Sequence, residues 1–168
     1  MQISSRFTIA VHILICIETF KEDYKITSDF LASSVNVNPV VIRRLLQQLK
    51  KAGIINVKRG SGGAYIEKPL DEITLLDVYN AVECIDNGNL FHFHENSNSR
   101  CPVGRNIHSV LDRRLDSIQQ AMEREMSSVT LQDIADDTDR TQHAEIFLNF
   151  FVVTVDITPR QVHIRCID

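Results

Sequence analysis

Positive charge and glycine gather in one short segment in the first half of the chain. Lys58 and Arg59 are followed directly by the run Gly60, Ser61, Gly62 and Gly63. Glycine lets a backbone turn approach a phosphate closely, and neighbouring cations supply the attraction. The segment therefore indicates a basic hairpin tip that contacts the phosphate backbone of a nucleic acid.

A second group of cations falls on a helix that we expect over residues 39–52, just before that tip. Asn38 is expected to cap this helix, and Pro39 suits its first position. The apolar stripe is Ile42, Leu45, Leu46 and Leu49, and the other face carries Val40, Arg43, Arg44, Gln47, Gln48, Lys50 and Lys51. An arginine can bridge O6 and N7 of guanine in the major groove, so Arg43 and Arg44 are predicted to read bases.

The other polar residues of this surface have less specific predicted roles. Gln47 could read adenine or be solvated, and Lys50 is expected to meet phosphate. Any single cation could be an ordinary solvated charge, but a cap, a reading face and a basic tip in this order favour DNA contact. The predicted contacts are Ser28, Asn38, Pro39, Val40, Arg43, Arg44, Gln47, Lys50, Lys58, Arg59, Gly60, Ser61, Gly62 and Gly63.

The elements that must position these residues are short and follow each other closely. We expect a buried helix from Ser4 or Ser5 to about Phe20, a second helix over 28–33 capped by Thr27, and a turn over 35–38. Strands over 54–58 and 64–68 would flank the glycine run. Residues 1–68 thus predict a winged helix-turn-helix, in a mostly α protein with a small β-hairpin (α+β).

Charge is divided unevenly along the 168 residues. Residues 1–68 carry +5 and residues 69–168 carry −9, which together give the net charge of −4. This division favours a half that faces a polyanion. No segment has the roughly 20 apolar residues of a membrane span. The four cysteines lack framework spacing, so we expect reduced thiols in a cytoplasmic protein.

Residues 69–136 are expected to hold a sensing loop and dimerisation helices. Helices are predicted over 74–85, 106–126 and 130–136, with a polar loop over 86–100. The apolar periodicity of the long helix favours a homodimer, and packing on the first and fourth helices is the alternative. Residues 137–168 form a C-terminal extension of uncertain status. This extension could be an extra strand, a swapped arm or a segment outside the native fold.

Several strings in the sequence resemble one family. They are NPVVIRRLL at 38–46, LKKAG at 49–53, RGSGGAY at 59–65, ITLLDVYNAVE at 73–83 and CPVGRNI at 101–107. The chain resembles the Rrf-two family of bacterial winged-helix transcription regulators over about residues 1–136. The resemblance implies a homodimer that binds a partly palindromic operator on double-stranded DNA, with the long helix forming the dimer and the preceding loop sensing a signal.

The sensing loop departs from the cluster-binding members of that family, which carry three cysteines there. This chain has only Cys101, and Cys84 lies back in the preceding helix. Clusters generally need four ligands, so an iron–sulfur cofactor is not expected. Cys101 could instead be a redox-sensitive thiol, or it could bind zinc with His92 and His94. The alternative, which we favour, is that the histidines are ordinary loop residues and Cys101 is inert.

Three classes of function are compatible with such a fold. A sequence-specific transcription regulator, acting as a repressor that responds to a redox or small-molecule signal, agrees best with the basic surface. An enzyme is not expected, because no nucleophile elbow, phosphate-binding loop or acid–base cluster occurs. A winged-helix protein-interaction module is the remaining alternative, since a fold does not define a function.

Overall fold

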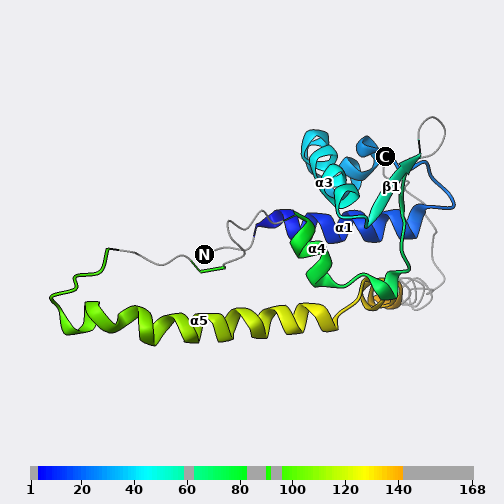
Figure 1. The fold of residues 1–168 in the computed structure, drawn as a ribbon. Coiled ribbons are helices and arrows are strands. Elements are labelled where there is room, and N and C mark those ends of the chain that lie inside the picture. Colours follow the sequence, from blue (N-terminus) through cyan, green and yellow to red (C-terminus); the bar gives the residue numbers. More distant parts are fainter. Residues whose placement is uncertain (1–3, 59–62, 83–89, 92–95, 142–168) are drawn as a thin grey trace, which may run out of the picture. The chain divides into compact units, whose positions relative to one another are not determined.

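The computed structural model describes residues 4–58, 63–82, 90–91 and 96–141 (Figure 1). The described part is mostly helical and contains one two-stranded antiparallel hairpin, which confirms the predicted fold class. None of the helices in these ranges is long and apolar enough to cross a membrane. Contacts divide the chain into a unit of residues 1–135 and a second unit of residues 136–168.

Helix α1 (Ser5–Phe20) is the centre of the first unit. The Ser4 hydroxyl oxygen accepts a hydrogen bond from the Arg6 backbone N–H at 3.2 Å, so Ser4 rather than Ser5 caps the helix. The helix packs against α2, α3, α4 and β2, so apolar residues around most of its circumference are covered. The buried residues are Ala10, Ile13, Leu14, Ile15, Cys16 and Ile17.

Helices α2 (Ser28–Val35) and α3 (Pro39–Lys51) form the predicted helix-turn-helix. Thr27 caps α2, and Asn38 caps α3 by accepting a bond from the Val40 N–H at 2.8 Å. The prediction that α2 ends at Ser33 was wrong. The helix continues to Val35 and closes where Asn36 adopts a left-handed conformation (φ 55°), which asparagine tolerates better than most residues.

Strands β1 (Ile55–Lys58) and β2 (Gly63–Ile66) form the wing, paired from Ile55–Ile66 to Lys58–Gly63. Strand β1 begins one residue later than predicted, and β2 begins one residue earlier and ends two residues earlier than predicted. The wing is joined to the helix-turn-helix because the Ala64 N–H donates to the Ile26 carbonyl at 3.0 Å. Gly63 has φ +136°, and a Cβ there would lie 2.6 Å from the Ile26 carbonyl oxygen. This approach therefore requires glycine.

The short helix η1 (Leu70–Glu72) leads into α4 (Leu75–Val82), and α5 (Pro102–Ser128) follows the loop. Helix α4 begins one residue later than predicted. The prediction that the long helix spans 106–126 was too short at both ends, because Cys101 takes the N-cap position and Pro102 opens the helix. Helix α5 contacts α4, yet none of its 27 residues is buried.

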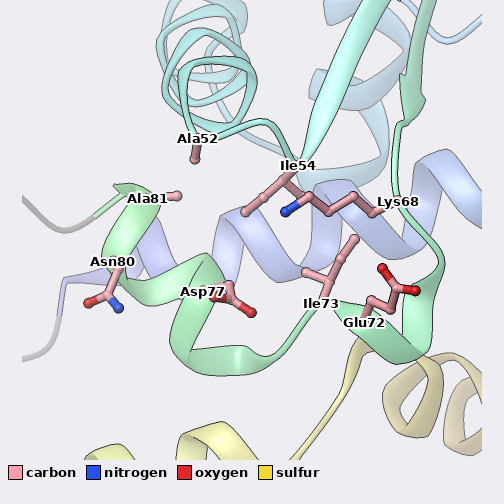
Figure 2. Close-up of a pocket in the computed structure, with 8 residues that line it drawn as sticks. All are labelled: Ala52, Ile54, Lys68, Glu72, Ile73, Asp77, Asn80 and Ala81. Carbon is pink, nitrogen blue, oxygen red and sulfur yellow. The ribbon is translucent and has the colours of Figure 1, made fainter.

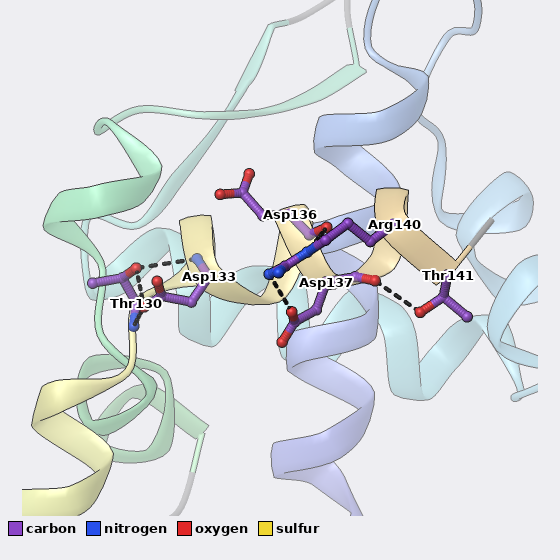
Figure 3. Close-up of polar contacts among 6 residues, drawn as sticks. All are labelled: Thr130, Asp133, Asp136, Asp137, Arg140 and Thr141. Carbon is purple, nitrogen blue, oxygen red and sulfur yellow. Dashed lines mark hydrogen bonds and ion pairs between the residues drawn. The ribbon is translucent and has the colours of Figure 1, made fainter. Parts of the chain in front are cut away.

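The end of α5 is joined to the start of α4 by a reciprocal pair of backbone bonds. Leu75 N–H donates to Val129 C=O at 2.9 Å, and Leu131 N–H donates to Ile73 C=O at 2.8 Å. Residues 131–141 are helical, so the helix predicted over 130–136 is longer than expected. Thr130 and Asp133 cap it reciprocally, as Figure 3 shows, with Asp133 N–H donating to the Thr130 hydroxyl at 3.2 Å. Further along, Arg140 pairs with Asp137.

Candidate nucleic-acid interface

Residues from the helix-turn-helix and the wing line one shared open groove. Its volume is about 410 Å³. The groove is lined by Lys25, Ile26, Thr27, Ser28, Arg43, Leu46, Gln47, Val57, Lys58, Gly63 and Ala64. The structure thus brings together five of the predicted contacts from the four elements α2, α3, β1 and β2: Ser28, Arg43, Gln47, Lys58 and Gly63.

Helix α3 presents its predicted reading face outward. Ile42, Leu45 and Leu49 are buried in the core, whereas Val40, Arg43, Arg44, Gln47 and Lys50 are exposed. Gln48 was expected on the outer face, but it is half-buried and its amide nitrogen donates to the Val82 carbonyl at 3.4 Å. That correction assigns Gln48 to packing on α4 and leaves the arginines on the outer face.

Two of the predicted contacts stabilise the start of α3. The Asn38 side chain caps the helix through its bond to Val40 N–H, and Pro39 occupies the first helical position, where it has no N–H to leave unpaired. These two residues therefore fix where α3 begins, and with it the position of the turn that carries Arg43 and Arg44.

Arg43 is held by the helix that precedes it. Its Nε donates to the Ser28 hydroxyl at 3.2 Å, and its Nη2 donates to the Asp29 carboxylate at 3.3 Å. Ser28 is among the predicted DNA contacts, whereas Asp29 is not. The signal that could have found Asp29 is an acid in the first turn of α2, facing the reading helix across the turn.

The described part of the wing presents one cation beside an aromatic ring. The Lys58 ammonium lies 4.9 Å from the centre of the Tyr65 ring, which holds the charge next to the groove. Arg59, Gly60, Ser61 and Gly62, the predicted tip, lie outside the described residues. Lys25, which is not among the predicted contacts, lines the same groove just before the Thr27 cap.

The candidate sensor Cys101 is an exposed free thiol at the start of α5. Hydrogen bonds from the backbone N–H groups of Gly104 and, second, Val103 lower the pKa of the Cys101 thiol. Helix N-termini stabilise a thiolate in this way. His92 and His94, its possible partners in a metal site, lie outside the described residues.

Within the described ranges, no three His, Cys, Asp or Glu side chains are grouped as a metal site would need. Cys16, the other free thiol of these ranges, is buried in α1 and 3.1 Å from the Ser34 hydroxyl. Cys16 and Cys101 come from opposite ends of the unit's sequence and have different surroundings. Among the described residues, these two thiols do not form the group of about four thiolates or close substitutes that an iron–sulfur cluster needs around one centre.

A smaller hollow of about 230 Å³ is lined by residues that follow α3, by residues that flank the two strands of the wing, and by η1 and α4 (Figure 2). Its lining includes Lys68 together with Glu72 and Asp77. Asp77 is already engaged, because its carboxylate accepts bonds from the Thr74 N–H and hydroxyl at 2.9 and 2.7 Å. The hollow contains none of the predicted DNA contacts.

The arrangement of cap, reading helix and wing agrees with one family model. The model of the Rrf2 family matches residues 3–137. This is the Rrf-two family that the sequence motifs resemble, and it is described as a family of iron-dependent transcriptional regulators. This chain belongs to the Rrf2 family. Its members are transcription regulators rather than enzymes, and this chain is accordingly a DNA-binding transcription regulator.

Relatives and solved structures match most of this chain. YwnA of Bacillus subtilis (strain 168), named as an HTH-type transcriptional regulator, is 45% identical over 132 residues, covering 79% of this chain and 96% of YwnA. A crystal structure described as that of a DNA-binding protein is 39% identical with a TM-score of 0.61, covering 77% of this chain and 98% of that one. The IscR structure of T. potens has a TM-score of 0.63 at 17% identity, over 84% of this chain and 91% of IscR, which is a likeness of fold.

Proposed function

We propose that this Rrf2 protein is a homodimeric repressor that binds a partly palindromic operator in the cytoplasm. The observation that carries the proposal is the exposed arginine face of α3, which continues through the groove to Lys58 of the wing. A helix of this kind enters the major groove while the wing follows the backbone. Occupation of a promoter is sufficient for repression.

The residues predicted from the sequence remain the proposed DNA contacts, with distinct roles. Arg43 and Arg44 read base edges, and Gln47 lies one turn further along the same exposed face of α3. Lys50 and Lys58 bind phosphates. The tip residues Arg59 to Gly63 follow the adjacent backbone. Asn38, Pro39 and Val40 bring the start of α3 against the duplex.

Helix α5 supports the homodimer. Its exposed large apolar residues are Val103, Val110, Leu111 and Ile118, which recur at intervals of seven, one and seven. At 100° per residue these positions share one face of the helix. A second copy of α5 would cover that face and bring two reading helices to a two-fold related site.

The proposed signal is redox or small-molecule in nature and acts without an iron–sulfur cluster. Support comes from Cys101, whose lowered pKa and exposure favour reaction of its thiolate with oxidants or electrophiles. We expect the Cys101→Ser protein to bind operator normally and to lose its response when oxidant is titrated. Ultraviolet–visible absorption of anaerobically purified protein tests the cofactor, since a cluster absorbs in the visible range.

The decisive experiment is the selection of bound sequences from random duplexes with the purified protein. A two-fold related site would support both the reading helix and the dimer. Binding should also weaken steeply with salt, with a slope of roughly −0.9 per neutralised phosphate. A protein-interaction module would yield no enriched sequence and no such slope.

A further inference from the structure

The side chain that reads DNA in the proposed function is tied to a neighbour before any DNA is bound. Ser28 and Asp29, in the first turn of α2, accept bonds from Nε and Nη2 of Arg43 in α3. Nε and Nη2 lie on the same edge of the planar guanidinium. The two acceptors therefore occupy one edge of the group together.

The geometry points to Asp29 as a positioning residue that sets base specificity through Arg43, with Ser28 as its helper. This inference rests on the proposed function. Asp29 is assigned no contact with the base itself. Its role is to orient a neighbouring guanidinium so that the group meets the base edge in one defined direction.

The guanidinium of Arg43 can still read a base while it is bonded to Ser28 and Asp29, because it has more donors than these two bonds use. Arginine has five N–H donors, and the two bonds to α2 use one on Nε and one on Nη2. The end of the fork, with one N–H on Nη1 and one on Nη2, remains directed away from that edge. Two parallel donors match O6 and N7 of guanine, so we expect a guanine at this position of each half-site.

The exposure of the pair shows that stabilising the fold is not its main contribution. The Arg43 and Asp29 side chains retain 56% and 73% of their accessible surface. Ion pairs this exposed add little to the free energy of folding. A long, flexible side chain held by two acceptors, however, loses less entropy when it docks on a base, and it docks in fewer wrong orientations.

The charge of Asp29 has a second consequence. A carboxylate beside the groove repels phosphate wherever the protein lands on DNA, and this penalty is the same for every sequence. Orientation of Arg43 favours the correct sequence alone. Asp29 thus weakens non-specific binding while it supports specific binding, which is a general way to raise a specificity ratio.

Two variants separate these effects in the full-length protein. Asp29→Asn removes the charge but keeps an oxygen that can accept from Nη2, whereas Asp29→Ala removes both. Asp23→Ala is the matched control, since Asp23 is an exposed acid of the loop before α2 and loses the same charge. Each protein is titrated with the best duplex from the selection and with a shuffled duplex, and the ratio of affinities is the readout.

We expect Asp29→Asn to tighten binding to both duplexes by a similar factor and to keep most of the preference. Asp29→Ala should tighten binding to the shuffled duplex and lower the preference about 3- to 5-fold, the scale of an exposed ion pair. Ser28→Ala should lower the preference by less. Arg43→Ala should lower it about 5- to 150-fold, the range for a bidentate contact to guanine.

The combined variant decides whether Asp29 acts through Arg43. In the Arg43→Ala background, Asp29→Ala should leave the preference unchanged, because no guanidinium remains to be oriented. An equal loss in both backgrounds, or a preference that survives both Asp29→Ala and Ser28→Ala, would overturn the inference while the proposed function stands. A wild-type protein that selects no sequence would overturn the proposed function itself.

Discussion

Helices α1 and α5 use similar apolar side chains with opposite results. Six of the 16 residues of α1 are buried, because α2, α3, α4 and the wing surround it. None of the 27 residues of α5 is buried, although four large apolar side chains lie on one of its faces. Helix α1 buries its apolar side chains against other elements of the same chain. Helix α5 leaves its apolar face exposed in the single chain, and a second copy of α5 would cover it in the proposed dimer.

The difference shows where stability and association are encoded. Apolar burial stabilises a fold in proportion to the area removed from water, so α1 contributes to folding of the single chain. The same area on α5 contributes only when a partner covers it. Variants on α1 or its neighbours should therefore change unfolding, and variants on α5 should change assembly.

The largest expected effect comes from a charge in the exposed face of α5. Ile118 is 54% exposed, so Ile118→Glu should leave the folded monomer intact and make a dimer interface unfavourable. Loss of the second half-site should weaken operator binding by on the order of 10²- to 10⁴-fold. Light scattering after gel filtration and a DNA titration measure the two effects.

Gln120→Glu is the matched control for this change. It adds the same charge two positions further along α5, at an exposed site on a different face of the helix. We expect it to remain dimeric. A dimer of unchanged stability for Ile118→Glu would show that this face is not the interface.

A pair of leucines compares the two regions with the same chemical change. Leu45 of α3 is 1% exposed and Leu111 of α5 is 39% exposed. Leu45→Ala should lower the free energy of unfolding by about 2–5 kcal/mol. Leu111→Ala should change it by about 0.5 kcal/mol or less.

Both leucine variants are best measured by urea unfolding in the Ile118→Glu background. Self-association then does not add to the stability of either protein. Similar losses for the two leucines would contradict the contrast between the core around α1, to which Leu45 belongs, and the exposed face of α5.

A smaller effect is expected at the junction of wing and core. Gly63→Ala would place a Cβ 2.6 Å from the Ile26 carbonyl oxygen at a φ of +136°, so we expect a loss of about 1–3 kcal/mol. Gly53→Ala is the control, because φ there is +71° with no atom within 4 Å of the added Cβ. Its loss should be only the roughly 1–2 kcal/mol of a left-handed non-glycine residue. Equal thermal unfolding of the two variants would argue against the close approach.

The smallest expected effect is a pH dependence after the end of α5. The Thr130 hydroxyl and, second, the Thr130 backbone N–H lower the pKa of Asp133. A lowered pKa in the folded state means stabilisation that is present above the ordinary aspartate value of about 4. This stabilisation is lost as the pH falls below that value and through the folded-state pKa.

Urea unfolding at a series of pH values tests this dependence. Asp133→Asn cannot titrate, so its stability should fall less than that of the wild type over the acidic range. Parallel curves for the two proteins would show that the Thr130 bonds do not favour the ionised carboxylate.

Local signals in the sequence were sufficient for much of the first region. The caps at Ser4, Thr27 and Asn38 and the proline at the start of α3 were all predicted, because each depends on residues a few positions apart. The motifs of the reading helix and wing likewise predicted the family that the comparisons confirm. The bounds of α2 and α5 were less well predicted, since Asn36 closes α2 and Pro102 opens α5 at positions where the apolar periodicity had already weakened.

Contacts between distant residues were decided only by the tertiary structure. The sequence identified Arg43 as a cation on an open face, yet its bonds to Ser28 and Asp29 depend on how α2 and α3 cross. The bonds that join Ile73 and Leu75 to Val129 and Leu131 equally depend on where α5 ends in space. Periodicity and capping are properties of neighbouring residues, so the sequence alone determines them. Which groups then meet depends on the packing of whole elements, and that requires the folded chain.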